Sequence, residues 1–564
     1  MKLLLLHSSH LEFQPHKKAV DSAEDCDKEP RRIEECLVVF NAFEAGDERD
    51  MSHVIERADE EIRDVAEQIN VERIVVYPWV HLTSEPGDIG KAMESQKLLE
   101  DKLKNDYEVI RSPFGWYKEF EIHVKGHPLS ELSREIRPEG EEEVDEKIDP
   151  KRLLDQISKT KLDRKDLKEN DHRIIGQKMN LFSFYSAAPG MVFWHENGMR
   201  ILDELKSFWR DMHRKAGYKE ISTPMVLDEK LWKISGHWEK YRDNMFPTEY
   251  EDRDMALKPM NCPGGILVYK SKSRSYRELP LRFGELGTVY REELSGVLSG
   301  LFRVNCFTQD DAHIYCKEDQ LKSEIEGVID LTDEIYSTFD LGYSVELSTR
   351  PEERIGSDEI WDKSEEILKE VLEESGVDYE LNEGDGAFYG PKIDFHIEDS
   401  LGRKWQCGTI QLDFSMPERF DLTYVGKDNK EHRPILIHRA ILGSLERFMG
   451  IILEHTDGNL PTWMAPVQVR VLSITDRNIP RSEEIFEMLE EEGIRSDRNF
   501  DSTTLSEKVR EAEIERVPYI VVIGDKEEES GELAVRRIWK DDIEYGVDPE
   551  KFVEEVKQRI RERR

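Results

Sequence analysis

The sequence predicts a multidomain chain that combines α/β and α+β architecture. Its 564 residues exceed the usual domain length of about 100–200 residues several times over, so we expect roughly three or four domains. Both ends alternate short apolar strands with amphipathic helices, which is typical of α/β domains. An acidic stretch that contains prolines, residues 137–152, indicates a boundary between the first region and the rest.

Residues 1–7, 36–43 and 73–82 are short apolar runs and predict buried strands. Residues 52–69 lie between the last two and have the apolar spacing of a helix. We therefore expect a first α/β domain over residues 1–136.

The acidic stretch begins a predicted linker, residues 137–175. After it, residues 198–217 have the periodicity of an amphipathic helix, and residues 218–226 predict a strand despite Pro224. These elements open a predicted middle domain, residues 176–465.

The last part of the chain alternates again. Strand-like residues 467–472, two helical segments and the strand-like PYIVVIG predict a compact α/β domain over residues 466–564. The helical segments are residues 481–494 and 505–517.

Composition limits the classes of protein that fit. The chain has 121 acidic and 81 basic residues, a net charge of −40, so contacts with nucleic acid would need clustered basic residues. The acidic excess fits either an ordinary acidic surface or adaptation to high salt. Six scattered cysteines without CxxC spacing argue against a disulfide framework or a four-cysteine zinc knuckle. With no apolar run of about 18 residues, we expect a soluble cytoplasmic protein without a membrane span.

One segment, YREELSGVLSGLFRVNCFTQDDAHIYC (residues 290–316), has the composition of a nucleotide site. Arg291 and Arg303 offer planar charged groups that suit phosphate oxygens, and Phe307 can stack on a base. A solvated hairpin is the alternative. Cys262, His313 and His438 lie too far apart in sequence for a local zinc motif, so by residue type alone a buried cysteine and two hydrogen-bonded core histidines are the usual explanation.

KPMNCPGG (residues 258–265), WQCGTIQLDF (405–414) and LIHRAILGSLERFMGIILEH (436–455) resemble motifs of the threonyl-tRNA synthetases, a family of class II aminoacyl-tRNA synthetases. The resemblance covers about residues 176–564 and is closest to the bacterial version. It implies an antiparallel-sheet catalytic domain, an anticodon-binding domain at residues 466–564, and a homodimer formed through the first class II motif around residues 198–226. It also implies tRNA(Thr), ATP and L-threonine as substrates.

The resemblance assigns roles to individual residues. It implies one Zn²⁺ per subunit with an open fourth position, and Mg²⁺ bound with ATP. Arg291, Arg447 and His237 would serve catalysis, with His237 helping to deprotonate the tRNA ribose. Zinc would be bound by Cys262, His313 and His438; ATP by Arg291, Glu293, Arg303, Phe307, Gln406 and Arg447; and threonine by Asp311, Tyr389, Lys392 and Gln411.

The first 136 residues resemble the editing domain of archaeal threonyl-tRNA synthetases, which is akin to D-aminoacyl-tRNA deacylases. The matching pieces are MKLLLLHSS, YPWVHLTS, SPFGWYKEF and KGHPLSELSR, although HSSH departs from the family's first motif. The resemblance implies an editing site at His81, Tyr117, Lys118 and Glu131. A domain that only docks tRNA is the alternative.

In the last domain, GDKEEESGELAVRR (residues 524–537) resembles the family's recognition strand. Lys526, Glu527 and Arg536 would contact the anticodon; solvated surface charge is the alternative. Two rival functions remain open. A prolyl- or seryl-type synthetase would share the arginines but has no use for the cysteine and two histidines. An RNA-binding or regulatory relic should have lost the phosphate-binding arginines or the metal ligands.

Overall fold

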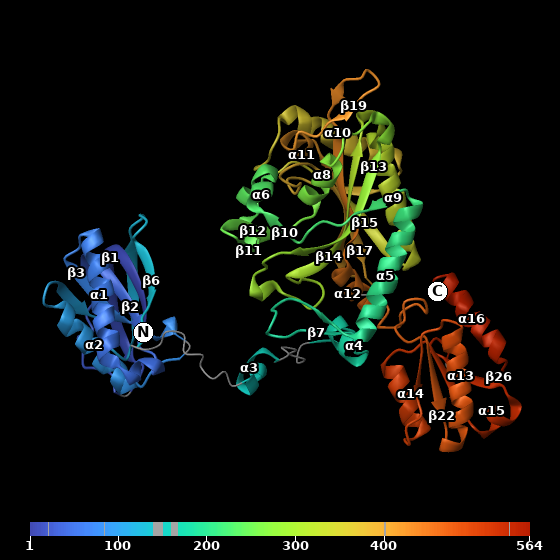
Figure 1. Ribbon diagram of the computed structural model, residues 1–564, viewed down its shortest axis with the longest axis horizontal. Coiled ribbons are helices and arrows are strands. Elements are labelled where there is room, and N and C mark those ends of the chain that lie inside the picture. Colours follow the sequence, from blue (N-terminus) through green and yellow to red (C-terminus); the bar gives the residue numbers. More distant parts are fainter. Residues whose placement is uncertain (21, 84, 139–149, 159–166, 400–401, 541) are drawn as a thin grey trace. The chain divides into compact units, whose positions relative to one another are not determined.

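The computed structural model describes residues 1–564 except 21, 84, 139–149, 159–166, 400–401 and 541 (Figure 1). It divides into two compact units, Met1–Asp149 and Pro150–Arg564. Among the described residues, no helix has the length and apolar character that crossing a bilayer requires. The predicted linker, residues 137–175, lies partly outside the described residues; its described parts include helix α3 (Pro150–Ile157) and the start of α4 (His172–Lys178).

The first unit is built on a six-stranded mixed sheet in the order β4-β3-β2-β1-β5, with β6 also paired to β1. Helices α1 (Met51–Ile69) and α2 (Ile89–Leu103) contact each other and share a core with one face of the sheet (Figure 1). The strands are β1 (Lys2–Lys18), β2 (Arg31–Ala42), β3 (Arg73–Pro78), β4 (Glu108–Arg111), β5 (Trp116–Val124) and β6 (Glu131–Glu135).

The predicted strands and helix of this unit are present, but β1 is longer than expected. The structure continues it to Lys18 because Leu11 and Phe13 still alternate into the core, and its second half pairs with β5. A second apolar cluster, which includes Phe40 and Tyr77, forms within the same sheet. Tyr77 also lines a cavity of the first unit.

The second unit contains an eight-stranded sheet in the order β16-β15-β17-β18-β21-β14-β13-β9. The central pairings are antiparallel, as the class II resemblance implies, and only the outermost pairs, β15 with β16 and β13 with β9, are parallel. The strands are β9 (Lys219–Glu220), β13 (Leu281–Tyr290), β14 (Cys306–Cys316), β15 (Gly342–Ser348), β16 (Tyr379–Asn382), β17 (Lys392–Glu398), β18 (Lys404–Asp413) and β21 (Ile435–Ser444).

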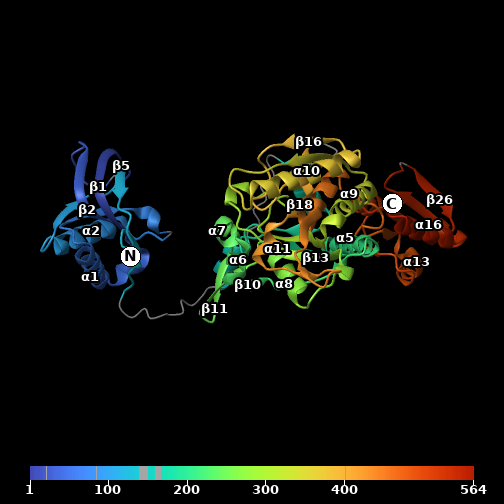
Figure 2. The same cartoon turned by 90° about the horizontal axis from the view of Figure 1, so that it is seen from above.

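Helices cover this sheet and share one large apolar core with it. The helix predicted at 198–217 is α5 (Glu196–Lys215), and α9 and α10 lie side by side (Figure 2). A separate three-stranded sheet has the order β10-β12-β11. Other elements of this part are α8 (Cys262–Lys270), α9 (Leu321–Thr338), α10 (Asp358–Glu374), α12 (Leu445–His455), β10 (Val226–Asp228), β11 (Pro247–Tyr250) and β12 (Arg253–Leu257).

The strand predicted at 218–226 is wrong in its extent. Only β9 pairs with β13, and the chain then leaves the sheet before Val226 begins β10. Thr223 explains the break, since its backbone N–H and its hydroxyl both donate to the Glu285 carboxylate, 2.8 and 2.9 Å away. Pro224, which follows, has no N–H for a ladder bond.

The last part of the chain is the predicted α/β domain, with a five-stranded sheet in the order β23-β22-β24-β25-β26. One correction concerns residues 524–537, which form a short helix before the strand instead of one recognition strand. The elements are β22 (Val469–Ser473), α13 (Ile479–Glu491), β23 (Ser496–Asn499), α14 (Leu505–Ile514), β24 (Tyr519–Ile523), α15 (Asp525–Ser530), β25 (Leu533–Arg537), β26 (Ile543–Val547) and α16 (Pro549–Arg561).

Candidate active site

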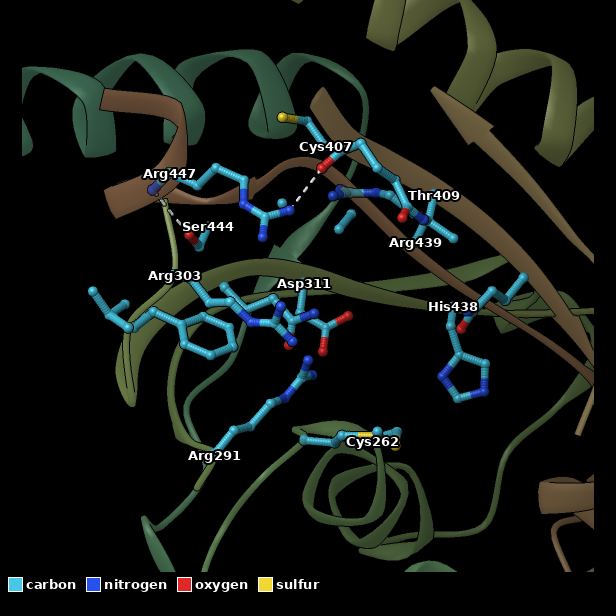
Figure 3. Close-up of a pocket in the computed structure, with 18 of the residues that line it drawn as sticks. Cys262, Arg291, Arg303, Asp311, Cys407, Thr409, His438, Arg439, Ser444 and Arg447 are labelled. Carbon is cyan, nitrogen blue, oxygen red and sulfur yellow. Dashed lines mark hydrogen bonds between the residues drawn. The ribbon is translucent and has the colours of Figure 1, made fainter. Parts of the chain in front are cut away.

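A cavity of about 570 Å³ opens over the antiparallel sheet of the second unit. Its floor is formed by β14, β18 and β21, and its ends are closed by the beginnings of α8 and α12 (Figure 3). The structure places twelve of the fourteen residues predicted for zinc, ATP, threonine and catalysis in this lining, and the two others, His237 and Lys392, outside it.

At one end, Cys262 begins α8, and His313 and His438 lie opposite each other on the paired strands β14 and β21. Each offers a ligand atom within 4.8 Å of the others. His438 Nε2 is 2.8 Å from Asp413 Oδ2, which leaves Nδ1 for ligation. His313 Nε2 is buried without a hydrogen-bond partner among the described residues. A thiol, two imidazoles and a buried nitrogen without a partner fit zinc.

Burial favours the neutral form of two members of this triad, His313 and Cys262, when no ion is bound. It lowers the pKa of His313 well below its usual value, helped by His438 and Arg439, and it raises the pKa of the Cys262 thiol, helped by Asp311 and Asp413. A bound cation would favour the thiolate instead. The burial of these side chains is therefore compatible with a bound metal ion, whose charge would stabilise the thiolate.

Beside the triad, Asp311 accepts a hydrogen bond from Asn261 Nδ2 at 3.1 Å, and the Tyr389 hydroxyl donates to Gln411 Oε1 at 2.5 Å. Asp311, Tyr389 and Gln411 are three of the four residues predicted for threonine. Lys392, the fourth, pairs with Asp394 and Asp385 at 2.7 and 3.0 Å.

The side chain of Lys392 is connected to the cavity lining through Asp394. That carboxylate also accepts hydrogen bonds from Gln406 Nε2 and Thr409 Oγ1, at 2.7 and 2.8 Å, and both of these residues line the cavity. Lys392 thus helps to hold Asp394, which in turn positions the side chains of Gln406 and Thr409.

At the other end, the guanidinium groups of Arg291, Arg303 and Arg447 face the cavity (Figure 3). Arg291 lies 5.1 Å over the Phe307 ring, and Arg303 donates to Glu293 Oε2 at 2.9 Å. These contacts form a cationic pocket beside an aromatic ring, which suits a nucleotide.

Within the described parts of the chain, Arg447 forms no helix-surface salt bridge, which is the ordinary alternative for an arginine in LGSLERF. Its Nε donates to the Phe302 carbonyl and its Nη1 to the Gln406 carbonyl, both at 3.0 Å. Ser444 caps α12 by accepting from the Arg447 N–H at 3.0 Å. The guanidinium is therefore oriented by backbone groups, and its charge is left for a ligand.

His237 lies behind the cavity wall. Its Nδ1 is 2.8 Å from Ser235 Oγ, and its Nε2 is 2.9 Å from the sulfur of Met260, which does line the cavity. Burial, followed by the charges of His438 and Arg291, lowers the pKa of His237 to about 3. In this arrangement His237 is a neutral, fully buried side chain.

Sequence reasoning missed several lining residues, among them Gln309, Thr409 and Ser444. Gln309 had a usable signal, because side chains alternate across a strand and residues 307, 309, 311 and 313 share one face of β14. The Gln309 Oε1 is also buried without a partner among the described residues. Ser444 carried the weaker signal of a helix cap.

The first unit has its own cavity, of about 560 Å³, lined by Tyr77, Trp79 and Trp116 among others. It contains His81, Tyr117 and Lys118 from the predicted editing set. Glu131 does not line it; it lies on β6, opposite Leu6 of β1.

Lys118 is the cation in the wall of this cavity. Its Nζ donates to the Pro113 carbonyl at 2.9 Å and lies 4.5 Å over the Tyr77 ring. Burial lowers the pKa of Lys118 to about 8, although Cys26 and Glu24 oppose that shift. At neutral pH the side chain remains mostly an ammonium group.

In the C-terminal domain, Lys526 and Glu527 lie on α15 and Arg536 on β25. Glu527 accepts a hydrogen bond from the Gly524 N–H at 3.0 Å. Arg536 pairs with Glu513 at 2.5 Å and is one-third exposed. A nucleic-acid contact at Arg536 would therefore compete with Glu513.

Comparison with known proteins adds three family matches. Residues 246–456 match the tRNA synthetase class II core domain (G, H, P, S and T), residues 1–136 the archaea-specific editing domain of threonyl-tRNA synthetase, and residues 468–559 an anticodon binding domain.

Curated relatives are named threonine–tRNA ligase. The one from Carboxydothermus hydrogenoformans is 54% identical over 398 residues, which is 70% of this chain and 62% of the relative. The one from Acetivibrio thermocellus is 55% identical over 369 residues, 65% of this chain and 58% of the relative. The chain thus spans about three-fifths of the length of these relatives.

Solved structures agree. The structure described as the RNA binding domain of threonyl-tRNA synthetase from Cryptosporidium parvum is 40% identical with a TM-score of 0.67, over 69% of this chain and 98% of that one. A putative threonyl-tRNA synthetase from Aeropyrum pernix is 32% identical with a TM-score of 0.62, over 70% of this chain and 97% of that one. Since both are matched along nearly their whole length, the chain belongs to the threonyl-tRNA synthetase family.

Proposed function

We propose that this protein is a threonine–tRNA ligase that also proofreads. It would activate L-threonine with ATP, transfer it to tRNA(Thr), and hydrolyse seryl-tRNA(Thr) in its N-terminal domain. The observation that carries the proposal is the layout of the larger cavity. Cys262, His313 and His438 lie at one end, and Arg291, Arg303 and Arg447 at the other.

The triad end fits the amino acid. Zinc held by Cys262, His313 and His438, one ion per subunit, would supply a Lewis-acidic position for an amine and a hydroxyl. Asp311 lies beside the triad and can accept the β-hydroxyl proton, while Tyr389 and Gln411 close the wall. Valine lacks the hydroxyl and would be rejected, whereas serine lacks only a methyl group, worth roughly 1–3 kcal/mol.

The arginine end fits ATP. When the threonine carboxylate attacks the α-phosphate, negative charge builds on the phosphates and pyrophosphate leaves, so fixed cations stabilise the transition state. Arg291 would bind the α-phosphate, Arg303 and Arg447 would bind the others, and Mg²⁺ entering with ATP would neutralise part of the phosphate charge. Glu293 and Phe307 would hold adenine. Because Met260 covers His237 Nε2, we propose a supporting role for His237 instead of direct proton transfer.

Amino-acid-dependent ATP–pyrophosphate exchange tests this function directly. We expect fast exchange with threonine, weaker exchange with serine and none above background with valine or proline. Serine should be activated because it keeps both the amine and the hydroxyl. Exchange with proline and not with threonine would identify a prolyl-type enzyme and refute the proposal.

We also propose a homodimer formed through the region between α5 and β10. Met225 and Val226 there are 51% and 42% exposed in the isolated chain, which fits a surface that a second subunit covers. Light scattering should give twice the chain mass of 66.1 kDa. A monomer with full exchange activity would contradict this prediction.

For the anticodon we propose contacts from Lys526, Glu527 and Arg536. Arg536→Ala should lower tRNA aminoacylation by about tenfold, a typical effect of losing one arginine contact, and leave ATP–pyrophosphate exchange unchanged. Arg561→Ala, on the exposed face of α16, is the matched control. Normal aminoacylation by the Arg536 variant would leave the solvated-surface alternative.

A further inference from the structure

A buried histidine outside the matched core motifs holds one wall of the larger cavity. His172 begins α4, well before residue 246, where the class II core match starts, and it is fully buried. Its backbone N–H and its Nδ1 both contact Glu454 Oε1 of α12, at 3.1 and 2.6 Å. Its Nε2 accepts a hydrogen bond from the Leu301 N–H at 2.9 Å. One imidazole thus bridges a helix and a loop that are distant in sequence.

These contacts exclude a simpler interpretation. Asp171, His172 and Glu454 have ligand atoms within 4.8 Å of one another and resemble a metal site. However, both ring nitrogens of His172 are engaged by protein groups, and Arg403 also pairs with Glu454. Because Nε2 accepts from an amide N–H, the ring proton is on Nδ1. The cluster is a filled hydrogen-bond network.

The loop that His172 holds contains Phe302, which lines the cavity. The Phe302 ring packs 4.3 Å from the His172 ring and stacks on Trp405 at 4.2 Å. Its carbonyl accepts the hydrogen bond from Arg447 Nε. A chain of direct contacts therefore runs from His172 through residues 301–302 to the guanidinium that faces the nucleotide end.

The loop at residues 300–302 packs tightly against the His172 ring. Gly300 has a φ of +49°, and a Cβ built there would lie 2.2 Å from His172 Nε2. The imidazole and the loop backbone are thus in close contact, which lets one hydrogen bond fix the position of Phe302.

We propose that His172 is a positioning residue for ATP: its Nε2 holds the loop at Leu301 so that the Phe302 carbonyl orients Arg447. This inference rests on the proposed function for the identity of the ligand. The metal triad receives no contact from the loop at 300–302 in the described structure, so threonine binding should not depend on His172.

Two substitutions separate the two hydrogen bonds of the ring. His172→Asn keeps a donor near the Nδ1 position for Glu454 and loses the acceptor for Leu301, whereas His172→Gln keeps a polar group near Nε2 and loses the bond to Glu454. We expect His172→Asn to raise the KM for ATP in exchange about tenfold with the KM for threonine within twofold. His172→Gln should stay near wild type for ATP.

The matched control is His195→Asn. His195 also uses both nitrogens, with Asn180 and Ser183 at 2.7 and 2.9 Å, but it does not line the cavity. Thermal unfolding of all variants provides a readout of structural damage. A merely structural role would lower Tm and alter ATP and threonine KM together in both His172 variants, and that result would overturn the inference, as would an unchanged ATP KM in His172→Asn.

Direct titration with ATP and Mg²⁺, without any amino acid, separates this inference from the proposed function. If wild type binds ATP but exchanges with another amino acid, the threonine proposal fails, and a weaker ATP Kd in His172→Asn still supports the role of His172. If wild type binds no ATP, both proposals are refuted.

Discussion

Replacing His313 with alanine should leave the purified protein without stoichiometric zinc and lower threonine-dependent ATP–pyrophosphate exchange by about a thousandfold. The expected loss corresponds to roughly 4 kcal/mol of transition-state stabilisation, the scale of a lost Lewis acid. His313 Nε2 is buried with no hydrogen-bond partner in the part of the chain described, so few protein interactions are lost with the ring. Metal analysis and exchange kinetics measure the two effects.

A pair of cysteine variants provides the control. Cys262→Ala should behave like His313→Ala, while Cys316→Ala removes an equally buried thiol that lies outside the cavity. Cys316→Ala should keep its zinc and its exchange activity. If His313→Ala retains full zinc and full threonine activation, the ligand set proposed here is wrong.

Replacing Lys118 with methionine should slow hydrolysis of seryl-tRNA(Thr) by about a hundredfold, the usual scale for removing one charged group from beside a reacting carbonyl. The ammonium lies in the wall of the N-terminal cavity, held by the Pro113 carbonyl. Methionine keeps the length of the side chain and removes its charge. Threonine activation should remain normal, since Lys118 belongs to the other compact unit.

Lys125→Met is the matched control, because Lys125 immediately follows the same strand, β5, and pairs with Glu35 at the surface. The pH dependence gives a second readout. With a pKa near 8, the ammonium is present below pH 8 and lost above it, so enzymatic hydrolysis should fall as pH rises through that value once spontaneous hydrolysis is subtracted. Unchanged hydrolysis by Lys118→Met would favour a tRNA-docking role for this domain.

The sequence predicted those helices correctly whose amphipathic periodicity is strong. Periodicity found α1, α5, α13 and α14 to within a few residues, because amphipathic spacing is decided locally. It failed at Thr223, where a contact with Glu285, 62 positions later, takes the chain out of the sheet. No local signal reports such a distant acceptor.

The candidate site shows the same division. The motifs identify Cys262, His313 and His438, but their meeting depends on the pairing of β14 with β21, which spacing alone does not predict. His237, Lys392 and Glu131 matched family motifs, yet the structure places none of them in a cavity lining. Met260 covers the first, and carboxylates hold the second. A motif can identify a candidate residue, but the residues that surround it in the fold determine whether its side chain lines the cavity.

Strand β14 has one more consequence. Phe307 and His313 are six positions apart on one face of it, so they lie about 20 Å apart at roughly 3.3 Å per residue. If Phe307 binds the base and His313 belongs to the amino-acid end, as proposed above, the length of β14 sets the distance between the two ends of the site. Insertions in the loop before residue 306 leave that length unchanged, whereas a single insertion within 307–313 would turn one end of the set to the opposite face. Length changes in this family should therefore be confined to the loop.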